Sequence, residues 1–115
     1  MYYTKTNAQE FTIPGETNGV LYPSHPQGEQ TVARVSLDGR YPEKGYSINE
    51  TCTETLYILS GSLTLTYGEE QYVMEPEDIF YIVPGTKYAL EGKGESLVLI
   101  SPEWDSDQNT IIEAE

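Results

Sequence analysis

Hydrophobic and polar residues alternate along much of the chain between residues 30 and 102, a pattern typical of β-strands that bury one face. In ETLYILS, residues 54–60, every second side chain starting with Glu54 points to one face, because successive side chains of a strand alternate. The segment SLTLTY, residues 62–67, repeats this alternation after Gly61. We therefore predict two strands here, separated by the glycine.

The remaining segments predict further short strands. The candidates are TVARVSLDG at 31–39, YSINE at 46–50, QYVMEP at 71–76, DIFYIV at 78–83, KYALEG at 87–92 and SLVLIS at 96–101. Turns are predicted at 68–70 and 91–94, where glycine is combined with charged residues. Short strands with turn signals at roughly 8–12-residue spacing are typical of an antiparallel double-sheet sandwich or barrel. The fold class is therefore predicted to be all-β.

The length of 115 residues predicts one domain. Composition and pattern divide this domain into three parts. Residues 1–29 are rich in Tyr, Thr, Asn, Gly and Pro, and we expect an N-terminal arm without helices and with an edge strand around Phe11 and Ile13. Residues 30–102 carry the alternating strands and are expected to form the barrel. Residues 103–115 form an acidic tail that we expect to pack on the barrel or extend it.

Charge and cysteine content narrow the classes of function. The chain has 19 Asp and Glu against 6 Lys and Arg, a formal net charge of −13, which repels phosphate backbones and anionic lipids. No apolar run reaches the roughly 20 residues that a membrane helix needs, and the first residues lack a signal-peptide pattern. The one cysteine, Cys52, cannot form an internal disulfide. We expect a cytoplasmic protein that binds neither nucleic acid nor membranes.

Two spacings connect the chain to a known family. Glu54 and Gly61 form an E-x6-G pattern, and Val83-Pro84-Gly85 follows at the end of the next hairpin. Over residues 30–102 these features resemble the two motifs of the cupin superfamily, which implies a small conical jelly-roll barrel with an internal pocket. The segments RYPEKGYSINETCTETLYILSG and PGTKYALEGKGESLVLISPEW resemble a subgroup of small cupins known mainly by their fold. The resemblance therefore implies the fold more than the function.

The metal ligands of the family are replaced in this chain. Cupins that bind metal typically use an H-x-H pair, a glutamate and a histidine from the second motif. The corresponding positions hold Ser47, Asn49, Glu54 and Tyr88, and the only histidine, His25, lies outside both motifs. Serine and asparagine are weak ligands for the metals that imidazole binds. We therefore expect no metal and no cofactor.

The same positions supply the candidate ligand site. We expect Ser47, Asn49, Cys52, Glu54 and Tyr88 to form a polar patch inside the barrel; Cys52 and Glu54 share a face if the chain is extended there. The leading hypothesis is a cupin without metal that binds a small polar molecule, either a sugar or a small organic acid. The residues alone do not name the ligand.

Two alternatives remain open at the level of sequence. In the first, the protein is a metal-independent isomerase or lyase of sugars or small acids, with Glu54 as base and Tyr88 as acid, since burial raises a carboxyl pKa toward the range of acid–base catalysis. In the second, it is a dimeric interaction module without catalysis. A small jelly roll has open sheet edges, and we expect a homodimer through the N-terminal region or a barrel face.

Overall fold

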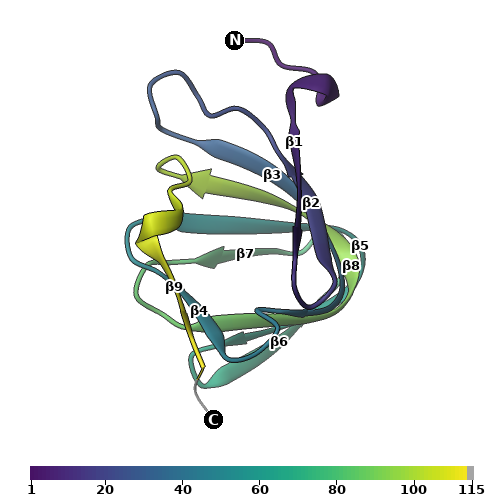
Figure 1. The fold of residues 1–115 in the computed structure, drawn as a ribbon. Helices are drawn as coiled ribbons and strands as arrows, with labels where there is room; N and C mark the ends of the chain where they lie inside the picture. Colours follow the sequence, from purple (N-terminus) through teal and green to yellow (C-terminus); the bar gives the residue numbers. More distant parts are fainter. Residues whose placement is uncertain (114–115) are drawn as a thin grey trace.

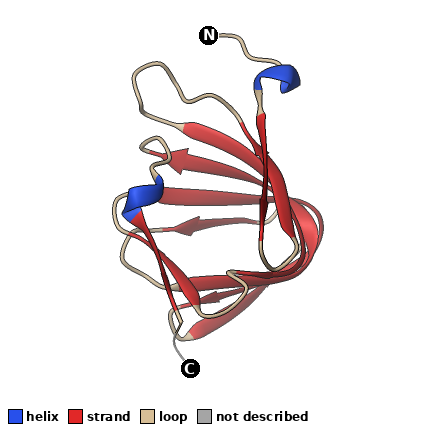
Figure 2. Cartoon of the chain, in the orientation of Figure 1, coloured by secondary structure: helices blue, strands red, loops and turns tan. Residues whose placement is uncertain are grey.

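The computed structural model describes residues 1–113, and almost all of its regular structure is antiparallel β-sheet (Figures 1 and 2). The last two residues of the expected tail, Ala114 and Glu115, lie outside the described residues. The strands are β1 (Gln9–Ile13), β2 (Thr17–Leu21), β3 (Thr31–Tyr41), β4 (Tyr46–Asn49), β5 (Thr53–Tyr67), β6 (Glu70–Met74), β7 (Ile79–Ile82), β8 (Tyr88–Ser101) and β9 (Asn109–Ile112). Two short 3-10 helices, η1 (Lys5–Asn7) and η2 (Ser106–Gln108), precede β1 and β9.

The sheet curls into two layers that share the long strands β5 and β8 (Figure 1). One layer has the strand order β1-β2-β3-β8-β5-β7, and the other has the order β9-β4-β8-β5-β6. The first half of β5 pairs with β7 and its second half pairs with β6. This arrangement is a jelly-roll barrel and confirms the predicted fold class.

Both long strands continue through segments where the sequence predicted an interruption. The predicted break at Gly61 and the predicted turn at 91–94 are therefore wrong. Gly61 is paired with Gly94 and has a φ of 79°, and a Cβ on it would overlap the carbonyl oxygen of Lys93. The glycines allow the two strands to approach and bend together, which turns one layer into the other.

The predicted alternation describes the buried face of β5 correctly. Glu54, Leu56 and Ile58 are buried, and Leu63 and Leu65 are buried beyond the bend. The side chains between them are half-buried or exposed. The alternation is interrupted only near the bend, where the register changes and several successive residues are exposed. The core therefore lies between the two layers, where apolar side chains of β3, β5 and β8 meet.

The two ends of the chain add strands to the barrel. β1 is an edge strand around Phe11, as predicted, and it pairs with β2, which the sequence did not predict. The expectation of no helix in the arm is wrong for one turn, η1, which begins after Thr4 because its side chain accepts a hydrogen bond from the Thr6 N–H. At the other end β9 pairs with β4. Within residues 1–113, no helix is long and apolar enough to cross a membrane.

Candidate functional site

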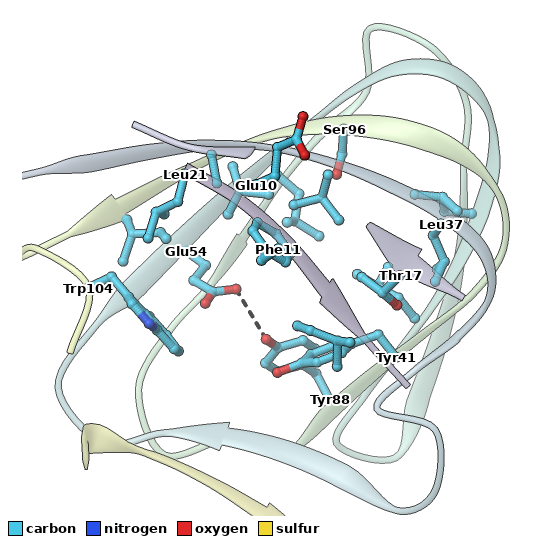
Figure 3. A pocket seen from close by; sticks show the side chains of 18 of the residues that line it. Glu10, Phe11, Thr17, Leu21, Leu37, Tyr41, Glu54, Tyr88, Ser96 and Trp104 are labelled. Atoms are coloured by element: carbon cyan, nitrogen blue, oxygen red, sulfur yellow. Dashed lines mark hydrogen bonds between the residues drawn. The ribbon is translucent and has the colours of Figure 1, made fainter. Parts of the chain in front are cut away.

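A cavity of about 370 Å³ lies inside the barrel (Figure 3). Much of its wall is apolar, with Leu56 and Leu63 from β5, Leu90 and Val98 from β8, and Phe11 from β1. Strand β1 crosses the cavity and places Phe11 over it (Figure 3). The described residues that line the cavity include no lysine, arginine or histidine. A ligand inside therefore meets apolar groups and a few oxygen-bearing side chains.

Glu54 and Tyr88 form the polar centre of this cavity (Figure 3). Glu54 lies near the start of β5 and Tyr88 at the start of β8, in different layers. The Tyr88 hydroxyl donates a hydrogen bond to Glu54 Oε1 at 3.1 Å. The two side chains are 8% and 2% exposed, so the pair is nearly excluded from bulk water. A ligand that enters the cavity meets a carboxyl group and a phenol side by side.

Burial changes the acidity of both groups. It raises the pKa of Glu54, because the charged carboxylate loses water, while the Tyr88 hydrogen bond and the nearness of the Asn49 amide partly oppose the rise. Burial likewise raises the pKa of Tyr88 well above its ordinary value, and the adjacent Glu54 charge raises it further. Tyr88 therefore acts as a neutral hydrogen-bond donor, and Glu54 is the group of the pair that exchanges a proton more readily.

No cation neutralises Glu54 among the described residues. Lys87 Nζ lies 4.7 Å from the ring centroid of Tyr46, and the Arg40 guanidinium lies 5.7 Å from it. Arg40 also donates to the carbonyl oxygens of Pro42 and Gly45. Within residues 1–113 the one ion pair joins Arg34 and Glu95 on an exposed part of the sheet. The Glu54 carboxyl group thus has a hydrogen-bond partner, Tyr88, but no ion-pair partner among residues 1–113.

Ser47 and Asn49 lie behind the cavity wall and not in it. Both are fully buried on β4, whose alternation places them on one face as predicted. Asn109 Nδ2 donates to Ser47 Oγ at 2.9 Å and to Asn49 Oδ1 at 2.9 Å. The Tyr41 hydroxyl, which lines the cavity, is 3.4 Å from Ser47 Oγ. These side chains form a polar layer that supports the Tyr41 side of the cavity.

The Gln108 side chain connects this polar layer to the loop before β5 through hydrogen bonds. Its Oε1 accepts hydrogen bonds from the backbone N–H groups of Glu50, Thr51 and Cys52 at 3.0–3.1 Å. Its Nε2 donates to Asn49 Oδ1 at 2.9 Å. The Asn49 Nδ2 has no hydrogen-bond partner within residues 1–113 and lies close enough to Glu54 to favour its charged form. The C-terminal segment therefore helps to set the electrostatics of the cavity.

A family model of the cupin domain matches residues 34–101, more than half of the chain. The chain belongs to the cupin family. Its barrel of two layers, with strands β5 and β8 shared between them, agrees with that membership. Among curated proteins, no match was found for this cupin.

Solved structures similar to this cupin include a nucleoside dehydratase. Pac13, described as a unique nucleoside dehydratase, has a TM-score of 0.87 and 19% identity over 98% of this chain and 91% of its own. Variants of Streptomyces PAC13 with uridine match equally well, at a TM-score of 0.87 and 19% identity over 98% of this chain and 90% of their own. KdgF from Halomonas sp. has a TM-score of 0.70 and 14% identity over 93% of this chain and 97% of its own. At these identities the likeness establishes the shared fold.

The residues of this cupin do not fit the metal centre that is common in the family. Ser47 and Asn49 hold the first two ligand positions, and both already make hydrogen bonds within the polar layer. Glu54 offers one carboxylate, which receives the Tyr88 hydroxyl. Within residues 1–113, no group of three or more His, Cys, Asp or Glu side chains comes together to hold a metal ion. The side chains at these positions suit hydrogen bonding better than metal coordination.

Cys52 is buried, as is Glu54 two residues later, but the two side chains do not meet in the cavity. The Cys52 Sγ–H donates toward the carbonyl oxygens of Pro102 and Glu103, at 3.5 and 3.7 Å. Burial raises the pKa of the Cys52 thiol, which keeps it protonated. Cys52 therefore packs beneath the C-terminal segment and does not contact a ligand in the cavity.

The sequence did not assign to the site several residues that line or support the cavity: Phe11, Tyr41, Trp104, Gln108 and Asn109. Tyr41 directly precedes Pro42 in a stretch that reads as a turn, although it ends β3. Gln108 and Asn109 lie in a polar, acidic segment without periodicity. No local signal in the sequence distinguishes their amides from those of an exposed tail.

Proposed function

We propose that this cupin binds a small, neutral, hydroxyl-bearing molecule in its barrel. The observation that carries the proposal is the Glu54–Tyr88 pair at the wall of a cavity that is otherwise mostly apolar. A carboxylate accepts hydrogen bonds from ligand hydroxyl groups, and a few placed polar groups in an apolar pocket are typical of small-molecule sites.

The size and charge of the cavity favour this class of ligand. A volume of about 370 Å³ is at the small end of the roughly 300–1,000 Å³ found for ligand pockets. Phe11 and Trp104 supply aromatic faces on which a sugar or a flat ring can pack. A small organic acid, the other ligand considered from the sequence, would meet Glu54 with no lining cation to offset the repulsion. The description of Pac13 as a nucleoside dehydratase is consistent with a neutral, hydroxylated ligand for this cupin.

Two probes of similar size test the proposal. Methyl β-D-ribofuranoside is neutral, whereas D-ribonate carries a carboxylate, and binding of each is measured by NMR chemical-shift titration. We expect the neutral probe to bind more tightly, Glu54→Gln to weaken its binding about tenfold, and the exposed control Glu91→Gln to leave it unchanged. Tighter binding of D-ribonate, or an equal loss in both variants, would overturn the proposal.

A second candidate function is proton-transfer catalysis, favoured by the raised pKa of Glu54 and its contact with Tyr88. In an elimination, the Glu54 carboxylate takes the proton from a carbon next to a carbonyl group. The C–H electrons form a C=C bond as the neighbouring C–OH bond breaks, and Glu54 returns the proton to the departing hydroxide, giving water. The Tyr88 hydroxyl donates a hydrogen bond to the carbonyl oxygen as negative charge develops on it.

Deuterium exchange tests the first step of this chemistry. D-ribulose, whose ketone activates the neighbouring C–H bonds, is incubated in D₂O with the protein, and loss of the proton signals is followed by NMR. We expect exchange with the wild type and with Glu91→Gln, and no exchange above background with Glu54→Gln. Equal exchange rates in all three proteins would end this candidate.

We also propose a homodimer through the outer side of the β7-β5-β8 layer, here called the outer face and made of Tyr57, Ile79, Tyr81, Leu97 and Leu99. The register pairs Tyr57 with Ile79 on one side and with Leu97 on the other, so these side chains share a face. Tyr81 is 60% exposed and Ile79 is 52% exposed. Apolar side chains this exposed on a sheet are typical of interaction surfaces.

The outer face carries no charged side chain, so a second copy can dock there with little charge repulsion. Two copies with a formal net charge of −13 each repel one another wherever acidic residues meet. On the neighbouring strand β3, Arg34 pairs with Leu97 and so continues the line of side chains Ile79, Tyr57 and Leu97 across the sheet. The charge of Arg34 is neutralised by Glu95. Light scattering tests this dimer: Ile79→Lys should give a monomeric mass, and Val73→Lys, at an exposed site on β6, should not. A monomeric wild type at high concentration would contradict the dimer.

We propose a cytoplasmic location as well. The free thiol of Cys52 is buried and stays reduced most readily in a reducing compartment. Cell fractionation with an antibody to the protein tests the location, and recovery in an extracellular or oxidising compartment would contradict it.

A further inference from the structure

A directed series of hydrogen bonds leads from the backbone before β5 to the cavity. Backbone N–H groups only donate, so the Gln108 oxygen that receives three of them is fixed as an acceptor, and its Nε2 must face Asn49. Asn49 Oδ1 is therefore an acceptor, and it also receives Asn109 Nδ2. Turning any of these amides would place oxygen against oxygen, or N–H against N–H, so their orientations are determined.

The series continues through Ser47. Because Asn109 Nδ2 also faces the Ile48 carbonyl oxygen, it is the donor toward Ser47 Oγ at 2.9 Å. A serine hydroxyl that accepts this bond still has its own proton to donate, and the Tyr41 hydroxyl lies 3.4 Å away. If the Ser47 proton goes to the Tyr41 oxygen, the Tyr41 proton is left to point into the cavity that Tyr41 lines.

We propose that Asn109, acting through Ser47, makes Tyr41 a hydrogen-bond donor, so that the cavity selects molecules with a hydroxyl group next to a carbonyl or ether oxygen. The ligand hydroxyl donates to Glu54, and the neighbouring ligand oxygen accepts from Tyr41. This inference rests on the proposed function for the Glu54 half of the interaction. Asn109 and Ser47 do not line the cavity and are positioning residues, whereas Tyr41 touches the ligand.

Two probes that differ in one oxygen distinguish a donor from an acceptor at Tyr41. In 2-hydroxycyclohexanone the second oxygen is a carbonyl, which only accepts. In trans-1,2-cyclohexanediol it is a hydroxyl, which accepts or donates. Dissociation constants from NMR titration give a discrimination ratio, defined as the value for the diol divided by that for the hydroxyketone. For the wild type we expect a ratio of about one, because the donor at Tyr41 suits both probes.

Four variants test the assignment, and only Asn109→Asp is expected to change the ratio. Asn109→Asp replaces the donating amide by an acceptor, so Ser47 turns its proton away from Tyr41 and Tyr41 becomes an acceptor. We expect hydroxyketone binding to weaken about five- to tenfold while diol binding is retained, which brings the ratio below one. Tyr41→Phe should weaken both probes, and Glu91→Gln should change neither. Ser47→Ala leaves the Tyr41 proton available to the ligand and should retain binding of both.

The outcomes separate this inference from the proposed function. If both probes bind the wild type and Asn109→Asp weakens them equally, the directed series is overturned while the Glu54 site remains. If neither probe binds the wild type, both the proposed function and this inference fail. If Asn109→Asp does not fold, Tyr41→Phe and Ser47→Ala decide: unchanged binding in Tyr41→Phe, or loss of hydroxyketone binding alone in Ser47→Ala, would contradict the assignment.

Discussion

Replacing Glu54 by glutamine should stabilise the protein at alkaline pH and have much less effect at acid pH. Burial raises the pKa of Glu54 in the folded protein above its value in the unfolded chain. Between those two pKa values the folded protein binds more protons than the unfolded chain, so this residue's contribution to stability falls as the pH rises through that window. Above the folded pKa the cost of burying the charge is fully present, and glutamine removes it.

The expected size follows from the surroundings of the carboxyl group. Removing an unpaired ion from water costs several kcal/mol, and about 1.5–3 kcal/mol is recovered through the charge-assisted hydrogen bond from Tyr88. We therefore expect Glu54→Gln to raise the free energy of unfolding by about 1–3 kcal/mol at pH 8–9. At about 4 °C per kcal/mol, the melting temperature should rise by about 4–12 °C.

Urea denaturation between pH 5 and pH 9, followed by far-ultraviolet circular dichroism, measures this difference. Glu91→Gln is the matched control, since it removes one exposed carboxylate from β8 and relieves the same net charge. The reasoning is refuted if the gain of Glu54→Gln over the wild type is the same at both ends of this range. It is refuted equally if Glu91→Gln reproduces the gain.

Three other changes test separate features. Gln108→Ala removes the acceptor of three backbone N–H groups and should lower the free energy of unfolding by about 2–4 kcal/mol, whereas the exposed Gln71→Ala should change it by less than about 0.5 kcal/mol; similar losses would contradict the role of Gln108. Gly61→Ala combines a positive φ with a steric overlap and should cost at least about 3 kcal/mol. Gly85→Ala, with a φ of 91° and open space around it, should cost only about 1–2 kcal/mol, and an equal cost would show that overlap is unimportant. Addition of Mn²⁺ or Zn²⁺ should leave the unfolding midpoint unchanged, because Glu54 has no strong co-ligands; stoichiometric binding by calorimetry would contradict this.

The parts of the fold that sequence predicted well are those where alternation decides burial. Glu54, Leu56 and Ile58 share a buried face, as the spacing required. Glycine was the main source of error, because its presence is compatible with a turn and with a close approach of two strands. Gly61 and Gly94 face each other across β5 and β8, a pairing between residues far apart in the chain that no local pattern reveals.

The candidate site was predictable only where the family resemblance supplied positions. Glu54 and Tyr88 were expected near each other on that basis, and they are hydrogen-bonded in the structure. The supporting amides were not predictable, since Gln108 reaches Asn49 across 59 positions of the sequence. Which polar residues of a tail fold back is determined by three-dimensional packing, here by β9 docking on β4.

The C-terminal segment determines the polarity of the cavity, which the barrel strands alone do not set. Gln108 and Asn109 orient Asn49 and Ser47, yet β9 lies at the edge of its layer and pairs only with β4. Edge segments open at lower free energy than central strands such as β5, which is paired on both sides. Native-state hydrogen exchange should therefore give β9 amides a lower opening free energy than β5 amides, and ligand should raise the value for β9, because binding to Tyr41 favours the docked segment. Equal protection of β9 and β5 without ligand would mean that the segment opens only with the whole barrel, and the polarity of the cavity would then be a fixed feature of the fold.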